Sequence, residues 1–350
     1  MKLNKLIAVL SLLLILAGTA FAQKIVIGST VPGGTALEND LKDIIGDINA
    51  SPTKFMTGFA DASIFASHGA TQRAFGDYKL FSFTLGVTTG LRVHTNPSNF
   101  ISEYEKLQDT LNDKGDLTIG TSPGINAQVG INASFLLKGL YLGVRFGYLD
   151  LKKDRFPISK ISIDDLTRLD FNMLHIGAVA NYQVLEGVNL GAFRWRGLEV
   201  GTGFLFQRTT YGFNFALGEI SDGSNKANPE LYFDMKTTTY TIPVEINTAI
   251  QLLWFLNLGI GAGADFAFGK NKLSFGADSP VYDGSNTYQG QIFARGGGST
   301  GPTFFNPKVM ANLGIKLGPV IIDIPAAYYF NFNGDGSTGL SIGITMGVVF

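Results

Sequence analysis

The chain has 350 residues, of which 45% are hydrophobic and only 16% are charged. That length alone would suggest two or three soluble domains, but so few charges are unusual for a soluble surface. The formal net charge of −1 excludes nucleic-acid binding through bulk positive charge. The absence of cysteine excludes disulfides, thiolate metal sites and cysteine nucleophiles. After residue 22 no apolar run reaches about 18 residues, which excludes a bundle of membrane helices.

Residues 1–22 have the pattern of a secretory signal peptide. Lys2 and Lys5 precede a long apolar stretch, and small residues follow at Ala20 and Ala22. A basic start, an apolar middle and an A-x-A end are typical of Sec-type export, with cleavage near Ala22–Gln23. We therefore expect an exported protein; an uncleaved membrane anchor is the less favoured reading.

Residues 23–77 do not follow the pattern of the rest of the chain. Thr35 and Glu38 form a capping box, and apolar residues then recur at helical spacing up to Ile48. Such a helix cannot bury its apolar stripe alone. We expect this segment to plug a lumen, the alternatives being a helix on the periplasmic mouth or a helix that binds a partner. The sequence "FMTGFADASIFA" is either part of that plug or an additional strand, and we favour the plug.

Residues 78–350 alternate between apolar and small or polar residues with period two, as amphipathic strands do. Each stretch is about 12–16 residues long, enough to cross a bilayer at the tilt of a membrane barrel. The fold class predicted is all-β, a transmembrane antiparallel up-and-down β-barrel of ten strands, with eight to fourteen possible. The predicted strands begin near Lys79, Ser122, Gly139, Phe171, Leu198, Lys236, Phe255, Thr303, Val320 and Thr338.

The predicted connections alternate between short turns and long polar segments. We expect the short turns on the periplasmic side and the long segments outside the cell. The long segments are residues 95–121, 154–170, 211–235 and 271–302, the last containing the glycine-rich "ARGGGSTGP" as a flexible loop. The connection 185–197 is longer than its class should be.

The end of the chain carries a family resemblance. Ile344, Met346, Val348 and Phe350 alternate with small or polar residues, and the chain stops on the aromatic residue. This looks like a bacterial outer-membrane β-barrel protein, either porin-like or fatty-acid-transporter-like, from a Gram-negative-type envelope. The resemblance implies that these four residues are the assembly signal read by the barrel-assembly machinery, and that outer-membrane lipid surrounds the barrel.

Eight charged or titratable residues interrupt the predicted strands and project to the inner face. Facing lipid would cost about 2–4 kcal/mol for a basic residue at mid-bilayer, so we expect them to line the lumen. They are Arg92, Arg145, His175, Glu199, Glu245, Asp265, Lys308 and Asp323. Lys308 lies between Asp265 and Asp323 on consecutive strands, an arrangement suited to cross-strand pairing.

Three functions fit this sequence. The first is a passive channel or transporter for a small solute, and the second is a closed structural or surface-recognition barrel resembling an adhesin. The least favoured is an omptin-like surface enzyme, for which His94 and His175 near the outer mouth would supply a general base. We expect no enzymatic activity, no cofactor and no metal.

Overall fold

The computed structural model describes residues 26–31, 52–69, 79–93, 119–152, 166–216, 218–221, 224–330 and 337–350. The predicted signal peptide, the predicted helix up to Ile48 and His94 lie outside the described residues. Within the described part of the chain, no helix is long and apolar enough to cross a membrane.

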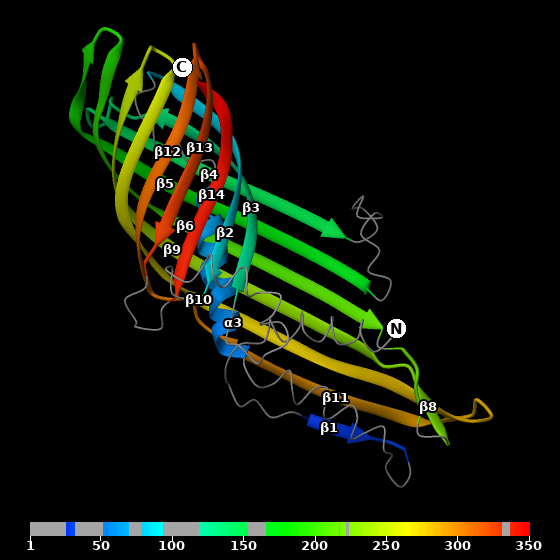
Figure 1. Ribbon diagram of the computed structural model, residues 1–350. Helices are drawn as coiled ribbons and strands as arrows, with labels where there is room; N and C mark the ends of the chain where they lie inside the picture. The colour runs from blue at the N-terminus through cyan, green and yellow to red at the C-terminus, as the bar shows by residue number, and fades with distance from the viewer. Residues whose placement is uncertain are drawn as a thin grey trace, which may run out of the picture.

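Ten antiparallel strands of the described chain close into a ring (Figure 1). They are β2 (Phe81–Val93), β3 (Ile119–Asn132), β4 (Leu140–Lys152), β5 (Leu166–Leu190), β6 (Phe193–Ala216), β9 (Glu230–Leu252), β10 (Leu256–Asp283), β12 (Phe305–Leu317), β13 (Val320–Tyr329) and β14 (Thr338–Val349). Each strand pairs with the next in this order, and β14 pairs with β2 to close the ring. The predicted all-β barrel of ten strands is confirmed.

The wall of the barrel is apolar outside and polar inside. On β2, Phe83 and Leu85 are exposed on the outer face, whereas Ser82 and Thr84, which alternate with them, are fully buried. Successive side chains of a strand point to opposite faces, so the period-two pattern of the sequence becomes an apolar exterior around a polar lumen. Ile344 and Met346, two of the predicted assembly-signal residues, share the exposed outer face of β14.

The two ends of the barrel differ. At one end, here called the turn end, tight connections follow β3, β5, β9 and β12. The connection 185–197 belongs to this class, because β5 and β6 continue to a two-residue turn at Gly191–Ala192. Gly191 takes a φ of +80°, which L side chains rarely adopt. The prediction of a long connection over residues 185–197 is therefore wrong, because these residues form the end of the hairpin between β5 and β6.

At the opposite end, here called the loop end, β5, β6, β9 and β10 continue beyond the ring as an extended sheet (Figure 1). β10 leaves β12 at Phe266 and pairs with β11 (Tyr288–Thr300) from Asn271 onward. Beyond β11 lies β1 (Val26–Ser29), and β7 (Ile220–Ser221) and β8 (Asn225–Ala227) flank the far end of β10.

The prediction of a loop over residues 271–302 is therefore wrong for most of that segment. Glycines in a strand often mark the close approach of another group. A Cβ on Gly296 would lie 2.7 Å from the ring of Phe275, and one on Gly298 would lie 2.8 Å from the Met56 side chain. The glycine-rich run is thus a strand, and its glycines leave room for the side chains of Phe275 and Met56. The long segments 154–170 and 211–235 also contain strand residues, at the start of β5, at the end of β6 and at the start of β9.

The single helix of the described chain, α3 (Pro52–Ala66), lies inside the ring. It contacts β2, β3, β6, β9, β10, β11 and β14, and every described side chain from Met56 to Gly69 except Thr57 is buried. A Cβ on Gly90 or Gly120 would come within about 2.0 Å of the helix backbone. Glycines at these points let helix and wall pack backbone to backbone. The segment "FMTGFADASIFA" is therefore helical and forms no strand.

Candidate functional site in the lumen

A cluster of buried charges joins the end of α3 to the wall. His68 lies in the turn after the helix, Glu245 on β9, Asp265 on β10 and Lys308 on β12. Glu245 and Lys308 are both backbone partners of Gly263, from opposite sides of β10. Because Gly263 has no side chain, the two long side chains can meet in front of it.

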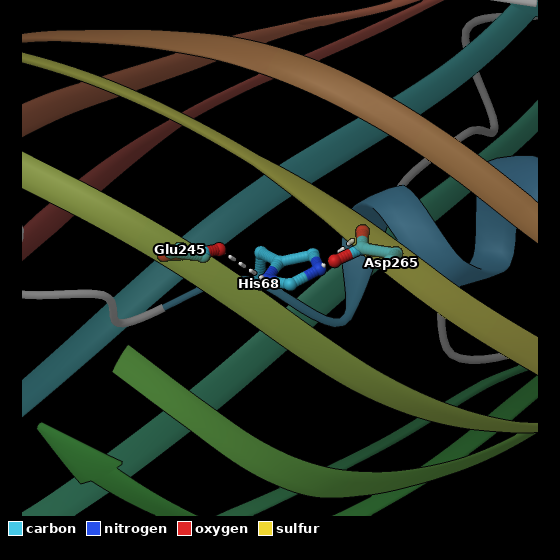
Figure 2. A group of neighbouring side chains, drawn as sticks. All are labelled: His68, Glu245 and Asp265. Atoms are coloured by element: carbon cyan, nitrogen blue, oxygen red, sulfur yellow. Dashed lines mark hydrogen bonds and ion pairs between the residues drawn. The ribbon is translucent and has the colours of Figure 1, made fainter. Parts of the chain in front are cut away.

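Lys308 is the centre of this cluster. Its Nζ lies 2.6 Å from Asp265 Oδ1 and 2.6 Å from Glu245 Oε1. His68 Nε2 lies 2.8 Å from Asp265 Oδ2, and His68 Nδ1 lies 3.7 Å from Glu245 Oε1. Figure 2 shows the imidazole ring between the two carboxylates. The ring from the helix segment thus bridges two strands of the wall.

The burial of the cluster makes its contacts consequential. Asp265 is fully buried, Lys308 is 2% exposed and His68 is 4% exposed. In such a low-dielectric environment charges interact far more strongly than in water, but each has also lost its hydration. Removing one member therefore leaves its partners buried and uncompensated. The cluster fixes the C-terminal end of the helix segment to β9, β10 and β12.

The three potential metal ligands of the cluster already share a cation. One ligand atom each of His68, Glu245 and Asp265 lies within 4.8 Å of the others, a spacing that a metal ion could use. The ammonium group of Lys308 contacts both carboxylates, however, and would repel a divalent cation placed between them. The arrangement therefore fits an ion-pair network better than a metal centre.

A second polar attachment holds the middle of the helix. Asp61, fully buried on α3, accepts hydrogen bonds from the backbone N–H and the hydroxyl of Thr303, both at 2.7 Å. Arg92 Nε lies 3.4 Å from Asp61 Oδ2, and Arg92 Nη2 donates to Ser337 Oγ at 2.9 Å. The guanidinium also lies over the ring of Phe65. A buried carboxylate with these partners ties the helix to β2 and to the segment before β12.

A small polar cavity of about 30 Å³ adjoins the cluster. His68 and Glu245 line it together with Arg145 and Glu199. Arg145 Nε donates to Gln128 Oε1 at 2.6 Å. The predicted lumen residues Arg145 and Glu199 therefore face the same space as the charge cluster.

The remaining predicted lumen residues, Arg92, His175 and Asp323, do not line this cavity. His175 is fully buried on β5, and Asp323 is fully buried on β13. Asp323 is opposite Gly314, six residues along β12 from Lys308, and accepts a hydrogen bond from Asn312 Nδ2 at 2.9 Å. Lys308 thus pairs with Asp265 and Glu245 on one side, while Asp323 has a different partner.

Sequence reasoning missed His68 and Asp61, the two helix-side members of these contacts. They are the two titratable residues of the segment 55–69, which otherwise consists of apolar, small and hydroxyl residues. A carboxylate and an imidazole isolated in such a segment are a recognisable signal, because burying them requires partners.

Polar groups also line the lumen above and below the charges. Among the described residues, the buried hydroxyls of Ser82, Thr237, Thr239 and Thr345 and the amide oxygen of Asn257 have no hydrogen-bond partner. Buried polar atoms are nearly always satisfied by protein or water. Water is therefore the partner expected along much of the inner wall.

Comparison with known protein families identifies one that matches most of the chain. A family profile described as Lsa36-like matches residues 21–348. No curated protein sequence matches the chain at a significant level.

Solved outer-membrane barrels are only remotely similar. A FadL homologue of Pseudomonas aeruginosa has 9% identity and a TM-score of 0.28, over 84% of this chain and 98% of that chain. The translocator domain of the autotransporter NalP from Neisseria meningitidis has 9% identity and a TM-score of 0.31, over 78% and 90%. LpxR from Salmonella typhimurium has 8% identity and a TM-score of 0.26, over 76% and 100%. Values this low give no basis for transferring a function to this chain.

Proposed function

We propose that this chain, which belongs to the Lsa36-like family, is an outer-membrane channel that passes a small polar solute when α3 moves within the barrel. Its outer face supports the membrane location, because exposed apolar residues such as Val144, Ile260 and Ile344 cover the wall. An apolar band around a closed antiparallel ring is the arrangement that lipid requires. The turn end would face the periplasm, after export directed by residues 1–22.

The observation that carries this proposal is the polar inner wall of the barrel, which could be hydrated. A helix packed permanently into a barrel would be best matched by apolar wall residues. The wall instead presents Ser82 and Thr84 on β2, Thr237 and Thr239 on β9, and Thr345 on β14. Displacing α3 would leave a lumen lined by hydroxyls, amides and charges, which suits a hydrated solute better than an oily one.

The contacts of the helix fit a gate. His68 and Asp61 bind the wall through ion pairs and hydrogen bonds, which water and solute ions can replace. Apolar packing of Met56, Phe59 and Phe65 adds to the closed state. With α3 in place, the cavity beside the charge cluster holds only about 30 Å³, as expected of a closed channel.

Conductance of the purified protein in a planar bilayer tests this function. We expect rare openings from the full chain and a large, steady conductance from a variant lacking residues 52–69. Heat-modifiable gel mobility establishes that the variant has folded. A folded, helix-free barrel that carries no ions would contradict the proposal.

A second function is favoured by the extended sheet. β10 has 28 residues, nearly three times the roughly 9–11 residues that a transmembrane strand needs. Its far half pairs with β9 and β11 outside the ring. Such a structure suits surface recognition. An epitope inserted at Gly284 should be labelled on intact cells if this hairpin is outside, and an unlabelled tag on assembled protein would exclude the surface role.

A further inference from the structure

Four basic residues gather on the outer face of the sheet, just beyond a row of aromatic rings. Phe206, Tyr240 and Phe268 are cross-strand partners on β6, β9 and β10, with ring centroids 5.3 and 5.4 Å apart. Two residues further toward the loop end, Arg208 and Lys270 flank Thr238 on the next row of the same face.

The following row brings two lysines directly together. Lys236 and Lys272 are opposite each other on β9 and β10, and both are exposed. Like charges directly opposite on one face of a sheet are destabilising. Among the described residues, no ion pair joins Arg208, Lys236, Lys270 or Lys272 to an acid. The four basic residues, here called the basic cluster, therefore carry more positive charge than the one described carboxylate beside them, Asp234, can balance.

The surrounding surface forms a shallow recess suited to an anion. A groove of about 510 Å³ is lined by Lys236, Lys270 and Lys272. Thr210 and Ser299 supply hydroxyl groups at its sides. Its acidic member, Asp234, already accepts a hydrogen bond from Arg168 Nη1 at 3.1 Å. Ammonium groups with hydroxyls beside them are the donors that phosphate oxygens accept from.

We propose that the basic cluster binds the phosphate group of an anionic lipid in the outer leaflet of the membrane. This inference rests on the proposed membrane location. The aromatic row marks the level where the acyl chains end, because membrane β-barrels carry girdles of aromatic residues at the two interfaces. The basic cluster begins one row beyond, at the height of the headgroups. A phosphate there would neutralise the repulsion between Lys236 and Lys272.

Lipid retention by the full-length folded protein in neutral detergent tests the proposal, with native mass spectrometry as the readout. The probes are phosphatidylglycerol and phosphatidylcholine with identical acyl chains, and inorganic phosphate alone. We expect phosphatidylglycerol to be retained in preference to phosphatidylcholine. The double substitution Lys236→Gln with Lys272→Gln should weaken its retention about tenfold or more, because basic residues near an anionic headgroup each contribute to binding.

A matched control changes two exposed lysines that have acidic neighbours. Lys152 is opposite Asp170 on the same outer face, and Lys226 Nζ lies 3.8 Å from Glu219 Oε1. Lys152→Gln with Lys226→Gln should retain phosphatidylglycerol as the unmodified protein does. Equal loss in both double variants would overturn the site, since it would show a response to net charge alone.

Two other results would also overturn the proposal. Equal retention of phosphatidylglycerol and phosphatidylcholine would remove the phosphate site. Displacement of the lipid by inorganic phosphate at comparable concentration would show that the basic cluster binds the free anion rather than the lipid. Because retention is measured in micelles, it is separate from the conductance of the lumen. A protein that binds the lipid but never conducts would contradict only the channel function.

Discussion

Lys308 on β12 forms a diagonal ion pair with Asp265 on the neighbouring strand β10. Its Nζ lies 2.6 Å from Asp265 Oδ1, although its backbone partner on β10 is Gly263. The same ammonium group contacts Glu245 on β9. One cation therefore compensates two buried carboxylates, and His68 joins them to the helix segment. The attachment of the helix segment and the cohesion of the wall therefore depend on the same group.

Replacing Lys308 by Met should destabilise the barrel by about 3–5 kcal/mol, because Asp265 and Glu245 would remain buried without their shared cation. Urea unfolding in liposomes measures the loss. The triple variant Lys308→Met, Asp265→Asn, Glu245→Gln should recover part of it, since the carboxylates then carry no charge. Unchanged stability of the single variant would show that the three groups do not form the network described.

Adding a methyl group at Gly90 should push α3 away from the wall. The new Cβ would lie 2.0 Å from the carbonyl oxygen of Ala62 and 2.8 Å from the N atom of Ala66, so the helix must shift. We expect Gly90→Ala to cost about 1–3 kcal/mol, as overpacking does, and to raise the channel's open probability. The control is Gly284→Ala, because nothing lies within 4 Å of a Cβ there. Identical conductance from both variants would show that α3 does not gate the channel.

The hairpin between β10 and β11 should lose order in acid. Asp283, outside the barrel, accepts hydrogen bonds from the hydroxyl and N–H of Ser285 and from the N–H of Thr287. The hydroxyl of Ser285 contributes most to lowering the pKa of the carboxyl below its usual value.

Since the folded pKa is lowered, Asp283 stabilises the turn above the unfolded pKa of about 3.9, and the effect is lost as the pH falls through the folded pKa. NMR titration of the carboxyl should give a pKa below that of an unstructured aspartate, and Asp283→Asn should remove the acid-dependent change in the turn amides. A normal pKa would show that the carboxyl does not hold the turn.

Deleting Phe350 should prevent assembly of the barrel. Its carbonyl accepts from the N–H of Leu80, its N–H donates to the carbonyl of Phe81, and its ring stacks on that of Phe81 with centroids 4.9 Å apart. The residue thus completes the junction between the last and first strands. We expect exported but unassembled protein, seen as loss of heat-modifiable mobility. A normal yield of assembled barrel would remove Phe350 from the assembly signal.

The wall could be predicted because it obeys a local rule. Alternation along β14, from Leu340 to Phe350, requires only that one face meets lipid and the other the lumen. The extended sheet escaped prediction although Leu273, Phe275 and Ala277 alternate with polar residues. The glycines of β11 have the composition of a loop, and only their contacts with Phe275 and Met56 show why a strand needs them.

The candidate site could be predicted only in part. Inward projection identifies Glu245, Asp265 and Lys308 as neighbours in the lumen, because consecutive strands of a barrel lie side by side. His68 is 197 residues from Asp265 in sequence, and no periodicity relates the two. The segment around it is rich in alanine, glycine and serine, so the sequence pattern alone did not decide between strand and helix.

The most direct test of the gate is a reversible lock between α3 and the wall. The hydroxyls of Ser63 on α3 and Thr209 on β6 lie 3.3 Å apart, close enough for Ser63→Cys and Thr209→Cys to form a disulfide. The chain has no other cysteine, so this bond would be unique. Conductance is measured in one bilayer before and after reduction, with each single cysteine variant as control. We expect no openings in the oxidised protein, and openings like those of the unmodified protein after reduction. Equal conductance in both states would contradict a gate formed by α3.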